Sequence, residues 1–310
     1  MKVQKNILLK KYTTFKIGGS AEYFVAVKTK EELIEAINFA KEKTAVPLIL
    51  GGGSNILASD KGYSGIVIKI QNSEITFDKE NITAGAGAQL SALVKKSSEY
   101  NLTGLEWAAG IPGTLGGAIR GNAGAFEGSI ADCLVSAEAY DIKKNEIVVL
   151  NKDNCFFGYR ESIFKKNKNL IIISAVLKLK EGDKEKIIKK IKENIEYRQV
   201  KHPKEPSAGS CFKNIFVEDL PSNFFEKFPE TKIAVKNGIL PVAFLIHSCA
   251  LKGERFGSAQ VSKIHPNFIV NLNGAGSDDV LQLISLVKKK IKEKYNLELK
   301  EEIEILDSIA

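Results

Sequence analysis

The sequence has few of the residues that build metal and redox sites. It has only four cysteines and three histidines, and no cysteine pair has C-x-x-C spacing. They are Cys133, Cys155, Cys211, Cys249, His202, His247 and His265. Zinc sites and thioredoxin-like sites need closely spaced ligands of these types. We therefore expect no metal, and we expect buried free thiols in a reducing compartment.

Long hydrophobic runs are also missing. The longest is near residues 170–177, "LIIISAVL", whereas a membrane-spanning helix needs about 20 apolar residues. The N-terminal stretch contains only "ILL", which is shorter than the core of a signal peptide. Hydrophobic residues make up 44% of the chain, enough for large cores. These features predict a cytoplasmic protein with no membrane partner.

Arginine is scarce, although the net charge is +8. The positive charge is mostly lysine interleaved with glutamate, which is typical of solvated helix faces. Without an arginine-rich tract or an aromatic RNA motif we expect no nucleic-acid partner, and RNA binding remains an alternative motivated by charge alone. The four arginines are Arg120, Arg160, Arg198 and Arg255. A planar guanidinium suits bidentate contacts, so these positions are of interest.

The hydrophobic patterns predict an α+β protein with two domains. Short strands and hairpin-like pairs alternate with helices over residues 21–200, ending in a charged helix at 183–200. The stretch "KHPKEPSAGS" then reads as a loop, so we place the boundary near Val200, with domains at 1–200 and 201–310. The second domain is predicted to contain a long helix at 277–295 and a final strand at 297–306.

Two glycine-rich stretches carry the first functional signal. They are "GGGSN" at 51–55 and "GIPGTLGGAIRGNAGAF" at 110–126, and neither matches a dinucleotide fingerprint or a P-loop. Bare backbone lets successive N–H groups approach an anion. The two loops are predicted to cradle a diphosphate, oriented by the side-chain amides of Asn55 and Asn122. The alternative for either loop alone is a tight turn at a strand end.

Seven motifs in order extend this signal over almost the whole chain. They are "YTTFKIGGSAEYF", "LGGGSNILASDKGYSG", "GLEWAAGIPGTLGGAIRGNAGAF", "GYRESIF", "SAGSCFKN", "LKGERFGSAQVSKIHPNFIVN" and "LKEEIEIL". With them the chain resembles the UDP-N-acetylenolpyruvoylglucosamine reductase family. The resemblance implies an FAD-binding fold of the vanillyl-alcohol-oxidase (PCMH) type, with two α+β subdomains at about 1–70 and 71–200. It also implies a C-terminal α+β substrate domain at 201–310.

The resemblance also implies a reaction. The family uses non-covalent FAD and NADPH to convert UDP-N-acetyl-3-O-(1-carboxyvinyl)-glucosamine to UDP-N-acetylmuramate. This step belongs to peptidoglycan precursor synthesis, and hence to cell-wall biogenesis, cell shape and cell division. The expected partner is the UDP-sugar, and the expected state is a monomer. Only 49 residues separate Arg160 from Ser210, so the chain is similar to the shorter type that lacks an inserted tyrosine loop.

Three catalytic residues follow from the resemblance. Ser210 matches the proton donor, Arg160 the arginine that stabilises the developing enolate, and Glu302 the catalytic glutamate. The neighbouring Cys211 is the stronger acid, but the motif places the donor one residue earlier. The usual L-E-P-E reads "LKEE" here, so Glu301 is a rival of Glu302. In a strand, Glu302 and Glu304 would share one face opposite the intervening isoleucines.

The resemblance assigns binding roles to two further sets of residues. For FAD these are Gly51, Gly52, Gly53, Ser54, Asn55, Gly110, Ile111, Pro112, Gly113, Gly116, Gly117, Asn122, Ala123, Gly124 and Arg198. For the substrate they are Tyr159, Lys201, Asn214 and His265.

Two other kinds of function remain as alternatives. One is a different enzyme on the same flavin fold, such as an oxidase of small alcohols. Some of those attach FAD through histidine, and no histidine precedes His202 here. The other is a non-catalytic nucleotide-binding module, which would not need Arg160, Ser210 and Glu302 together. A flavin spectrum of the purified protein would separate either flavoenzyme from a non-catalytic module or an RNA-binding protein.

Overall fold

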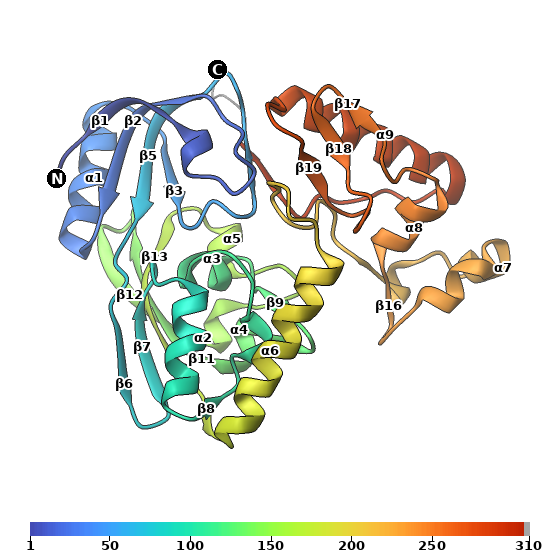
Figure 1. Ribbon diagram of the computed structural model, residues 1–310. Coiled ribbons are helices and arrows are strands. Elements are labelled where there is room, and N and C mark those ends of the chain that lie inside the picture. The colour runs from blue at the N-terminus through green and yellow to red at the C-terminus, as the bar shows by residue number, and fades with distance from the viewer. Residues whose placement is uncertain (307–310) are drawn as a thin grey trace.

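The computed structural model, drawn in Figure 1, describes residues 1–306. It contains two large hydrophobic cores. One core is formed by residues between 25 and 179, and the other mainly by residues between 208 and 303. The first core lies between two sheets and their helices. The charged helix α6 (Lys184–Lys201) leads from this part of the chain into the second, close to the predicted end at Val200.

The first sheet combines parallel and antiparallel strands. Its order is β1-β2-β5-β3, where β1 (Gln4–Leu8) is antiparallel to β2 (Ser20–Val27), while β5 (Tyr63–Ile70) is parallel to both β2 and β3 (Pro47–Leu50). Helix α1 (Lys30–Glu42) packs on it through apolar residues spaced three and four apart. Strands β3 and β5 are parallel and therefore end at the same edge of the sheet. The 51–55 loop, which follows β3, thus leaves the sheet at the edge where the chain passes from β5 to the second sheet.

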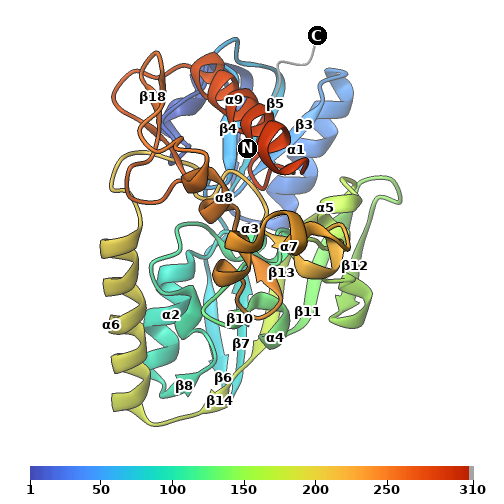
Figure 2. The same ribbon diagram turned by 90° about the vertical axis from the view of Figure 1, so that its right-hand side faces the viewer.

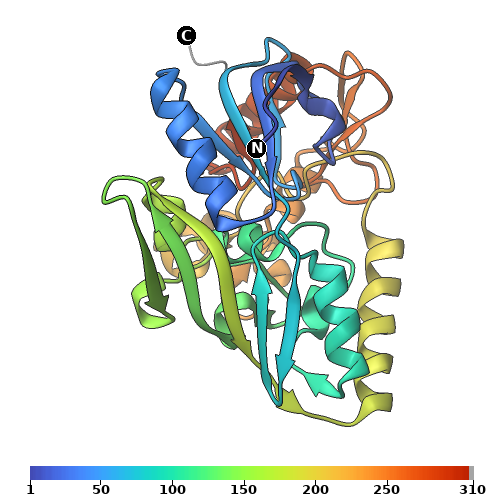
Figure 3. The same cartoon turned by 90° about the vertical axis from the view of Figure 1, so that its left-hand side faces the viewer.

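The second sheet is antiparallel and has five strands (Figure 3, below the first sheet). In order they are β12 (Glu146–Asn151), β11 (Leu134–Asp141), β13 (Leu170–Lys178), β7 (Asn81–Gly85) and β6 (Ile75–Asp78). β11 and β12 form an antiparallel hairpin, one of the hairpin-like pairs expected within residues 21–200. Figure 2 shows α6 beside α2 (Leu90–Glu99) along this part of the molecule. The smaller elements are α3 (Leu115–Arg120), α4 (Ile130–Cys133), α5 (Ile163–Lys166), β8 (Leu102–Thr103), β9 (Gly124–Ala125), β10 (Gly128–Ser129) and β14 (Lys180–Glu181).

The C-terminal part is a small α+β unit built around the long helix α9 (Ser277–Tyr295), as the sequence predicts. Its other elements are β15 (Ile215–Phe216), α7 (Phe224–Lys227), β16 (Ile239–Leu240), α8 (Val242–Ser248), β17 (Arg255–Phe256), β18 (Ala259–Val261) and β19 (Ile269–Asn271). Short 3₁₀ helices occur at Leu9–Lys11, Glu106–Ala108, Asp153–Cys155, Val217–Asp219 and Pro229–Ala234.

The chain returns to the N-terminal part at its end. Strand β20 (Glu304–Leu306) pairs in parallel with β4 (Ile56–Ala58), which directly follows the 51–55 loop. The predicted strand over 297–306 is wrong in its first part, because residues 297–300 pair with no strand. These residues pack leucines into the C-terminal core instead, and the chain bends at 302–303 before β20 begins.

Candidate active site

The two glycine loops lie against each other. A Cβ on Gly52 would come 2.6 Å from the Gly113 Cα, and one on Gly51 would come 2.6 Å from the Thr114 Oγ1. Gly53 has φ +65° and packs on the Tyr12 carbonyl, so a side chain there would be both strained and blocked. Much of the glycine content is thus required by close packing within the protein. Close packing between the loops is thus a second reason for glycine there, beside the predicted approach of backbone amides to an anion.

The loops still present groups suited to a diphosphate. Among residues 1–306, the backbone amides of Gly52, Gly53 and Ser54 donate to no protein acceptor. Gly117 is open, since an added Cβ would meet only Thr114 Oγ1 at 3.7 Å. Thr114 itself is 2% exposed, and its hydroxyl has no partner within the described part of the chain. Free amides, an open glycine and an unpaired hydroxyl beside them fit an anionic cofactor group.

Arg198 connects α6 to the second glycine loop. Its Nε donates to the Ala109 carbonyl at 2.9 Å, and its guanidinium lies 5.0 Å from the Phe126 ring centroid. Burial lowers the pKa of Arg198, yet its buried Nη2 has no acceptor within residues 1–306. A buried guanidinium N–H without an acceptor is costly, so this atom is suited to a ligand oxygen. The placement agrees with a cofactor role beside Gly110, whose Cα faces the Arg198 side chain.

Arg160 occupies a strained hairpin turn. Gly158 and Glu161 exchange both backbone hydrogen bonds, and between them Arg160 has φ +57°. Such backbone conformations are unfavourable for non-glycine residues and need support from their surroundings. Lys165 provides part of it, because its Nζ donates to the Arg160 carbonyl at 3.1 Å. The turn directs the guanidinium to the carbonyls of Asn122 and Gly124 in the second glycine loop.

The structure brings Glu302, and not Glu301, to this arginine. Arg160 Nε lies 2.6 Å from Glu302 Oε1, and both side chains are mostly buried, at 23% and 16% exposed. Glu301 instead pairs with Lys288 on α9. Ile303 between the two acidic side chains at 302 and 304 is buried in the C-terminal core. Glu302 and Glu304 therefore lie on the face opposite Ile303, as expected, although the chain is bent there.

Ser210 lies next to Glu302 through the backbone. The Glu302 amide donates to the Cys211 carbonyl at 2.8 Å, and Ser210 forms an isolated bridge with Phe268. Preceding it, Gly209 has φ +80° and open space at its Cβ position. The Ser210 side chain is partly exposed. Ser210, Arg160 and Glu302, which lie far apart in sequence, are thus gathered in one region.

Asn267 holds the Ser210 segment in place and was not among the predicted site residues. Its side chain accepts from the Phe212 amide at 3.0 Å and donates to the Phe212 carbonyl at 2.8 Å. Its own carbonyl accepts from the Cys211 amide at 2.7 Å. The residue is 3% exposed. Nothing in the local sequence "IHPNFIVN" indicates that Asn267 binds the backbone of Phe212, 55 positions earlier in the chain.

Cys211 is unsuited to donate the proton. Complete burial raises the pKa of its thiol to about 12. The thiol lies among the apolar side chains of the C-terminal core rather than at the Arg160 surface. The structure therefore favours the neighbouring Ser210.

Tyr159 and Asn214, two predicted substrate residues, lie together beside Arg160. The Asn214 amide donates to the Tyr159 hydroxyl at 3.3 Å, and the Arg160 guanidinium is 5.1 Å from the Tyr159 ring centroid. Desolvation raises the pKa of Tyr159, and the charge of Glu302 raises it further. Asn214 also accepts from the Val242 amide at the start of α8.

The other two predicted substrate residues lie near the end of α6. Lys201 is exposed and forms no ion pair within residues 1–306. His265 packs edge-on against Phe268 at 4.8 Å and His202 at 5.7 Å, and its buried Nδ1 has no partner in the described structure. Since Phe268 bridges to Ser210, His265 is close to the candidate proton donor.

The side-chain amides of Asn55 and Asn122 are used within the protein. Asn55 Nδ2 donates to the Glu302 carbonyl at 3.0 Å, and Asn122 Nδ2 donates to the Gly158 carbonyl at 2.8 Å. Each asparagine thus joins a glycine loop to a segment that carries Glu302 or Arg160. In this arrangement one N–H of each amide positions a candidate catalytic segment, and the second N–H of each has no protein acceptor among the described residues.

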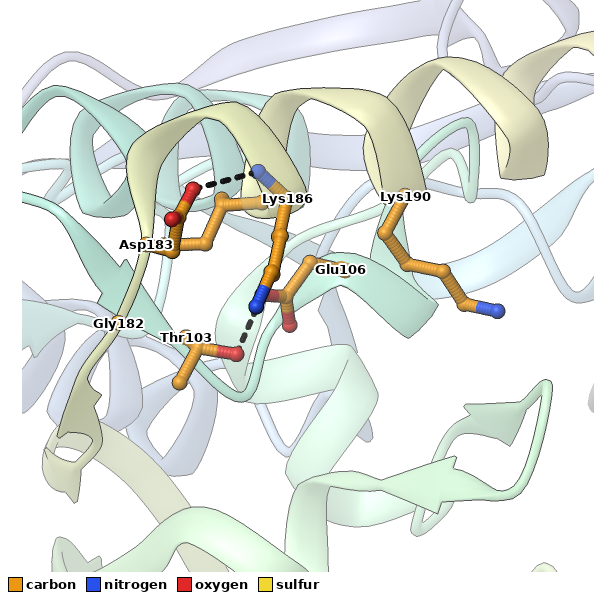
Figure 4. A pocket seen from close by; sticks show the side chains of 7 residues that line it. Thr103, Glu106, Gly182, Asp183, Lys186 and Lys190 are labelled. Atoms are coloured by element: carbon orange, nitrogen blue, oxygen red, sulfur yellow. Dashed lines mark hydrogen bonds between the residues drawn. The ribbon is translucent and has the colours of Figure 1, made fainter.

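A separate cavity of about 500 Å³ opens at the start of α6 (Figure 4). Its polar groups bind one another: Glu106 accepts from the Thr103 hydroxyl at 2.6 Å, and Asp183 accepts from the Lys186 amide at 3.0 Å. Lys190, the lining residue nearest to Arg198 along α6, is eight residues from it, or about 12 Å at 1.5 Å per residue. This cavity is therefore not part of the candidate site.

Known proteins place this arrangement in a class. A model described as "FAD binding domain" matches residues 21–151, which include both glycine loops. A model described as "UDP-N-acetylenolpyruvoylglucosamine reductase, C-terminal domain" matches residues 201–306. The protein therefore has the FAD-binding fold of the vanillyl-alcohol-oxidase type, followed by a C-terminal domain of these reductases.

Individual relatives cover nearly the whole chain. UDP-N-acetylenolpyruvoylglucosamine reductase of Lachnoclostridium phytofermentans is 40% identical over 98% of this chain and 93% of its own length. The Bacillus pumilus protein of that name is 37% identical over 98% of this chain and 94% of its own length. The crystal structure of the reductase (MurB) from Thermus caldophilus covers 99% of this chain and 100% of its own, with 34% identity and a TM-score of 0.78. The chain belongs to the UDP-N-acetylenolpyruvoylglucosamine reductase family.

Two further findings concern the described residues alone. Within 1–306 no group of three or more His, Cys, Asp and Glu side chains is arranged to hold a metal ion. None of the helices in this range is long and apolar enough to cross a membrane.

Proposed function

We propose that this protein is an FAD-dependent reductase that converts UDP-N-acetyl-3-O-(1-carboxyvinyl)-glucosamine to UDP-N-acetylmuramate with NADPH. The observation that carries the proposal is the gathering of Arg160, Glu302 and Ser210 beside the glycine loops. Bound FAD would supply the hydride-transfer chemistry between NADPH and the vinyl CH₂ carbon of the substrate. The remaining chemistry falls to side chains of this chain.

The glycine loops and Arg198 hold the cofactor. The free amides of Gly52, Gly53 and Ser54 bind the diphosphate, and the unpaired Nη2 of Arg198 supplies a cationic donor. No histidine precedes residue 202, so the cofactor is held without a histidine linkage.

Arg160 stabilises charge that develops on the substrate. Hydride addition to the vinyl carbon places negative charge on the neighbouring carbon, which spreads into the attached carboxylate. Arg160 uses Nε for Glu302. It uses one N–H of each Nη atom for the Asn122 and Gly124 carbonyls, which leaves one N–H on each Nη atom for this anion. Tyr159 lies against the same guanidinium and limits its exposure to water. Glu302 fixes the orientation of Arg160.

Ser210 donates the proton to the carbon next to the carboxylate. An isolated serine hydroxyl is a weak acid, but the carbon that it protonates is strongly basic after hydride addition. Asn267 fixes the backbone beside Ser210, which keeps the hydroxyl in place. Lys201, Asn214 and His265 bind the remainder of the UDP-sugar in this proposal.

The product and the donor set the cellular context. UDP-N-acetylmuramate is a precursor of peptidoglycan, so the enzyme acts in the cytoplasm, in a pathway that supports cell-wall biogenesis, cell shape and division. Its proposed state is a monomer. The direct test is turnover: the purified protein should oxidise NADPH beyond the single equivalent that reduces its flavin only when the enolpyruvyl UDP-sugar is present. NADPH oxidation that is coupled to oxygen alone and unaffected by the sugar would contradict the proposal.

A further inference from the structure

Two glutamates near the C-terminus each pair with an arginine of the FAD-binding part. Glu302 pairs with Arg160, and Glu304 pairs with Arg120 at the end of α3. The second pair is partly exposed, at 35% for the Arg120 side chain and 29% for the Glu304 side chain. Neither Arg120 nor Glu304 is among the predicted site residues.

The two arginines are also tied to each other. Ser162, which is fully buried, donates from its hydroxyl to the Arg120 carbonyl at 2.7 Å. It lies two residues after Arg160 in the same turn. On the glutamate side, the Glu304 amide donates to the Asn55 carbonyl, and the Asn55 side chain donates to the Glu302 carbonyl. Both pairs are therefore held in one rigid arrangement.

Charge balance explains why a second arginine is useful. Four cations, Arg120, Arg160, Lys165 and Lys213, surround three carboxylates, Glu161, Glu302 and Glu304. Lys213 is committed to Glu161 at 2.5 Å. Lys165 donates to a carbonyl and interacts with both Arg120 and Glu304. A partly buried carboxylate at 304 that lost Arg120 would be drawn to Lys165 and Arg160.

We propose that Arg120 is a positioning residue that holds Glu304 away from Arg160, so that the Arg160 guanidinium serves one carboxylate of the protein and the carboxylate of the substrate. The inference rests on the proposed function, because it concerns how Arg160 meets that substrate. Arg120 itself needs no contact with the substrate. Its role is to neutralise a competitor two residues from Glu302.

The test is a set of three variants: Arg120→Met, Glu304→Gln and the two combined. The dissociation constant of the enolpyruvyl UDP-sugar for the oxidised holoenzyme is measured from the change in flavin absorbance. Arg120→Met should weaken binding about tenfold, as for one lost charge-assisted contact. Glu304→Gln alone should stay within about twofold of wild type. The combined variant should recover to within about threefold, because no free carboxylate remains to compete.

The combined variant separates this role from a merely structural one. If the pair only ties β20 to α3, the combined variant should bind the sugar no better than Arg120→Met does. That result overturns the inference. Flavin content and melting temperature are measured for each variant. If Arg120→Met does not accumulate as holoenzyme, Arg120→Lys replaces it, and a tenfold loss despite the retained charge also overturns the inference. Failure of the wild-type protein to bind the sugar would instead refute the proposed function.

Discussion

The Arg160 guanidinium lies 2.6 Å from the Glu302 carboxylate, although 142 positions separate the two residues. Arg160 belongs to a turn in the FAD-binding part, and Glu302 to the segment by which the chain returns from the C-terminal part. The candidate site therefore forms only when both parts are folded and in contact. The charged residues of this site can therefore be tested one at a time, with exposed lysines elsewhere on the surface as controls.

We expect the substrate to be bound through specific cations rather than through net charge. Arg160→Ala should weaken substrate binding or turnover by about tenfold or more, since it removes charge-assisted contacts in a partly buried site. Lys201→Ala should also weaken them, by a smaller factor. The exposed Lys189 on α6 provides the matched control. Steady-state kinetics of the three variants are the measurement, and equal losses at all three positions would refute a site-specific role.

The protein should purify with FAD that is held without a covalent bond. The free amides of the first glycine loop and the unpaired Arg198 Nη2 supply the non-covalent contacts. Acid precipitation should release all of the flavin into the supernatant, where its absorbance spectrum identifies it. Chromophore that remains with the precipitated chain would contradict this expectation. Arg198→Met should lower FAD affinity, measured by titrating the apoprotein.

Stability should fall in mildly acidic solution partly because of His202. Burial, together with the charge of Arg198 and the neighbouring His265, lowers the pKa of His202 to about 4, from 6.5 in the unfolded chain. Between these values the unfolded chain binds more protons, so this contribution is complete above pH 6.5 and is lost as the pH falls toward 4. After allowance for partial exposure it amounts to about 1–2 kcal/mol.

The variant His202→Phe keeps the packing against Phe268 and removes the titrating group. Its melting temperature should vary less than that of the wild type between pH 7 and pH 4.5. The exposed His247, changed to Gln, is the control and should leave the pH dependence unaltered. Identical pH profiles for His202→Phe and wild type would contradict the account of this histidine.

Residue patterns predicted much of the fold, but they did not predict the local backbone features that depend on contacts between distant segments. The helical pattern over 277–295 predicted α9, and the hairpin-like patterns within 21–200 agree with the pairing of β11 and β12. The bend at residues 302–303 could not be predicted, because it is imposed by backbone bonds to Asn55 and Cys211. Those partners are far away in sequence.

The candidate site was only partly visible for the same reason. Arg160, Ser210 and Glu302 were predicted from motifs, and the structure brings them to one region. The clamp by Asn267 and the pairing of Arg120 with Glu304 depend on contacts across the fold that no local pattern carries. The glycines were interpreted as ligand-facing, and Gly51 and Gly52 also allow two loops to touch.

The proposed reaction depends most on Ser210 as the proton donor. Its two half-reactions, flavin reduction and flavin reoxidation, can be observed separately. Reduction of the flavin by NADPH requires no proton on the substrate carbon, whereas reoxidation by the enolpyruvyl sugar does. Rapid mixing of Ser210→Ala should show nearly normal flavin reduction and reoxidation slowed by about two orders of magnitude or more, as for a lost general acid. Cys211→Ala should change neither step, because that thiol is buried and stays protonated.

The decisive measurement is the rate of flavin reoxidation by the sugar in Ser210→Ala, compared with its rate of flavin reduction. A large loss confined to reoxidation, with Ser210→Cys restoring part of it, is the predicted result. If both steps slow equally, Ser210 has a structural role and the assignment of the proton donor is wrong. If Cys211→Ala alone abolishes reoxidation, the donor is one residue further along the chain.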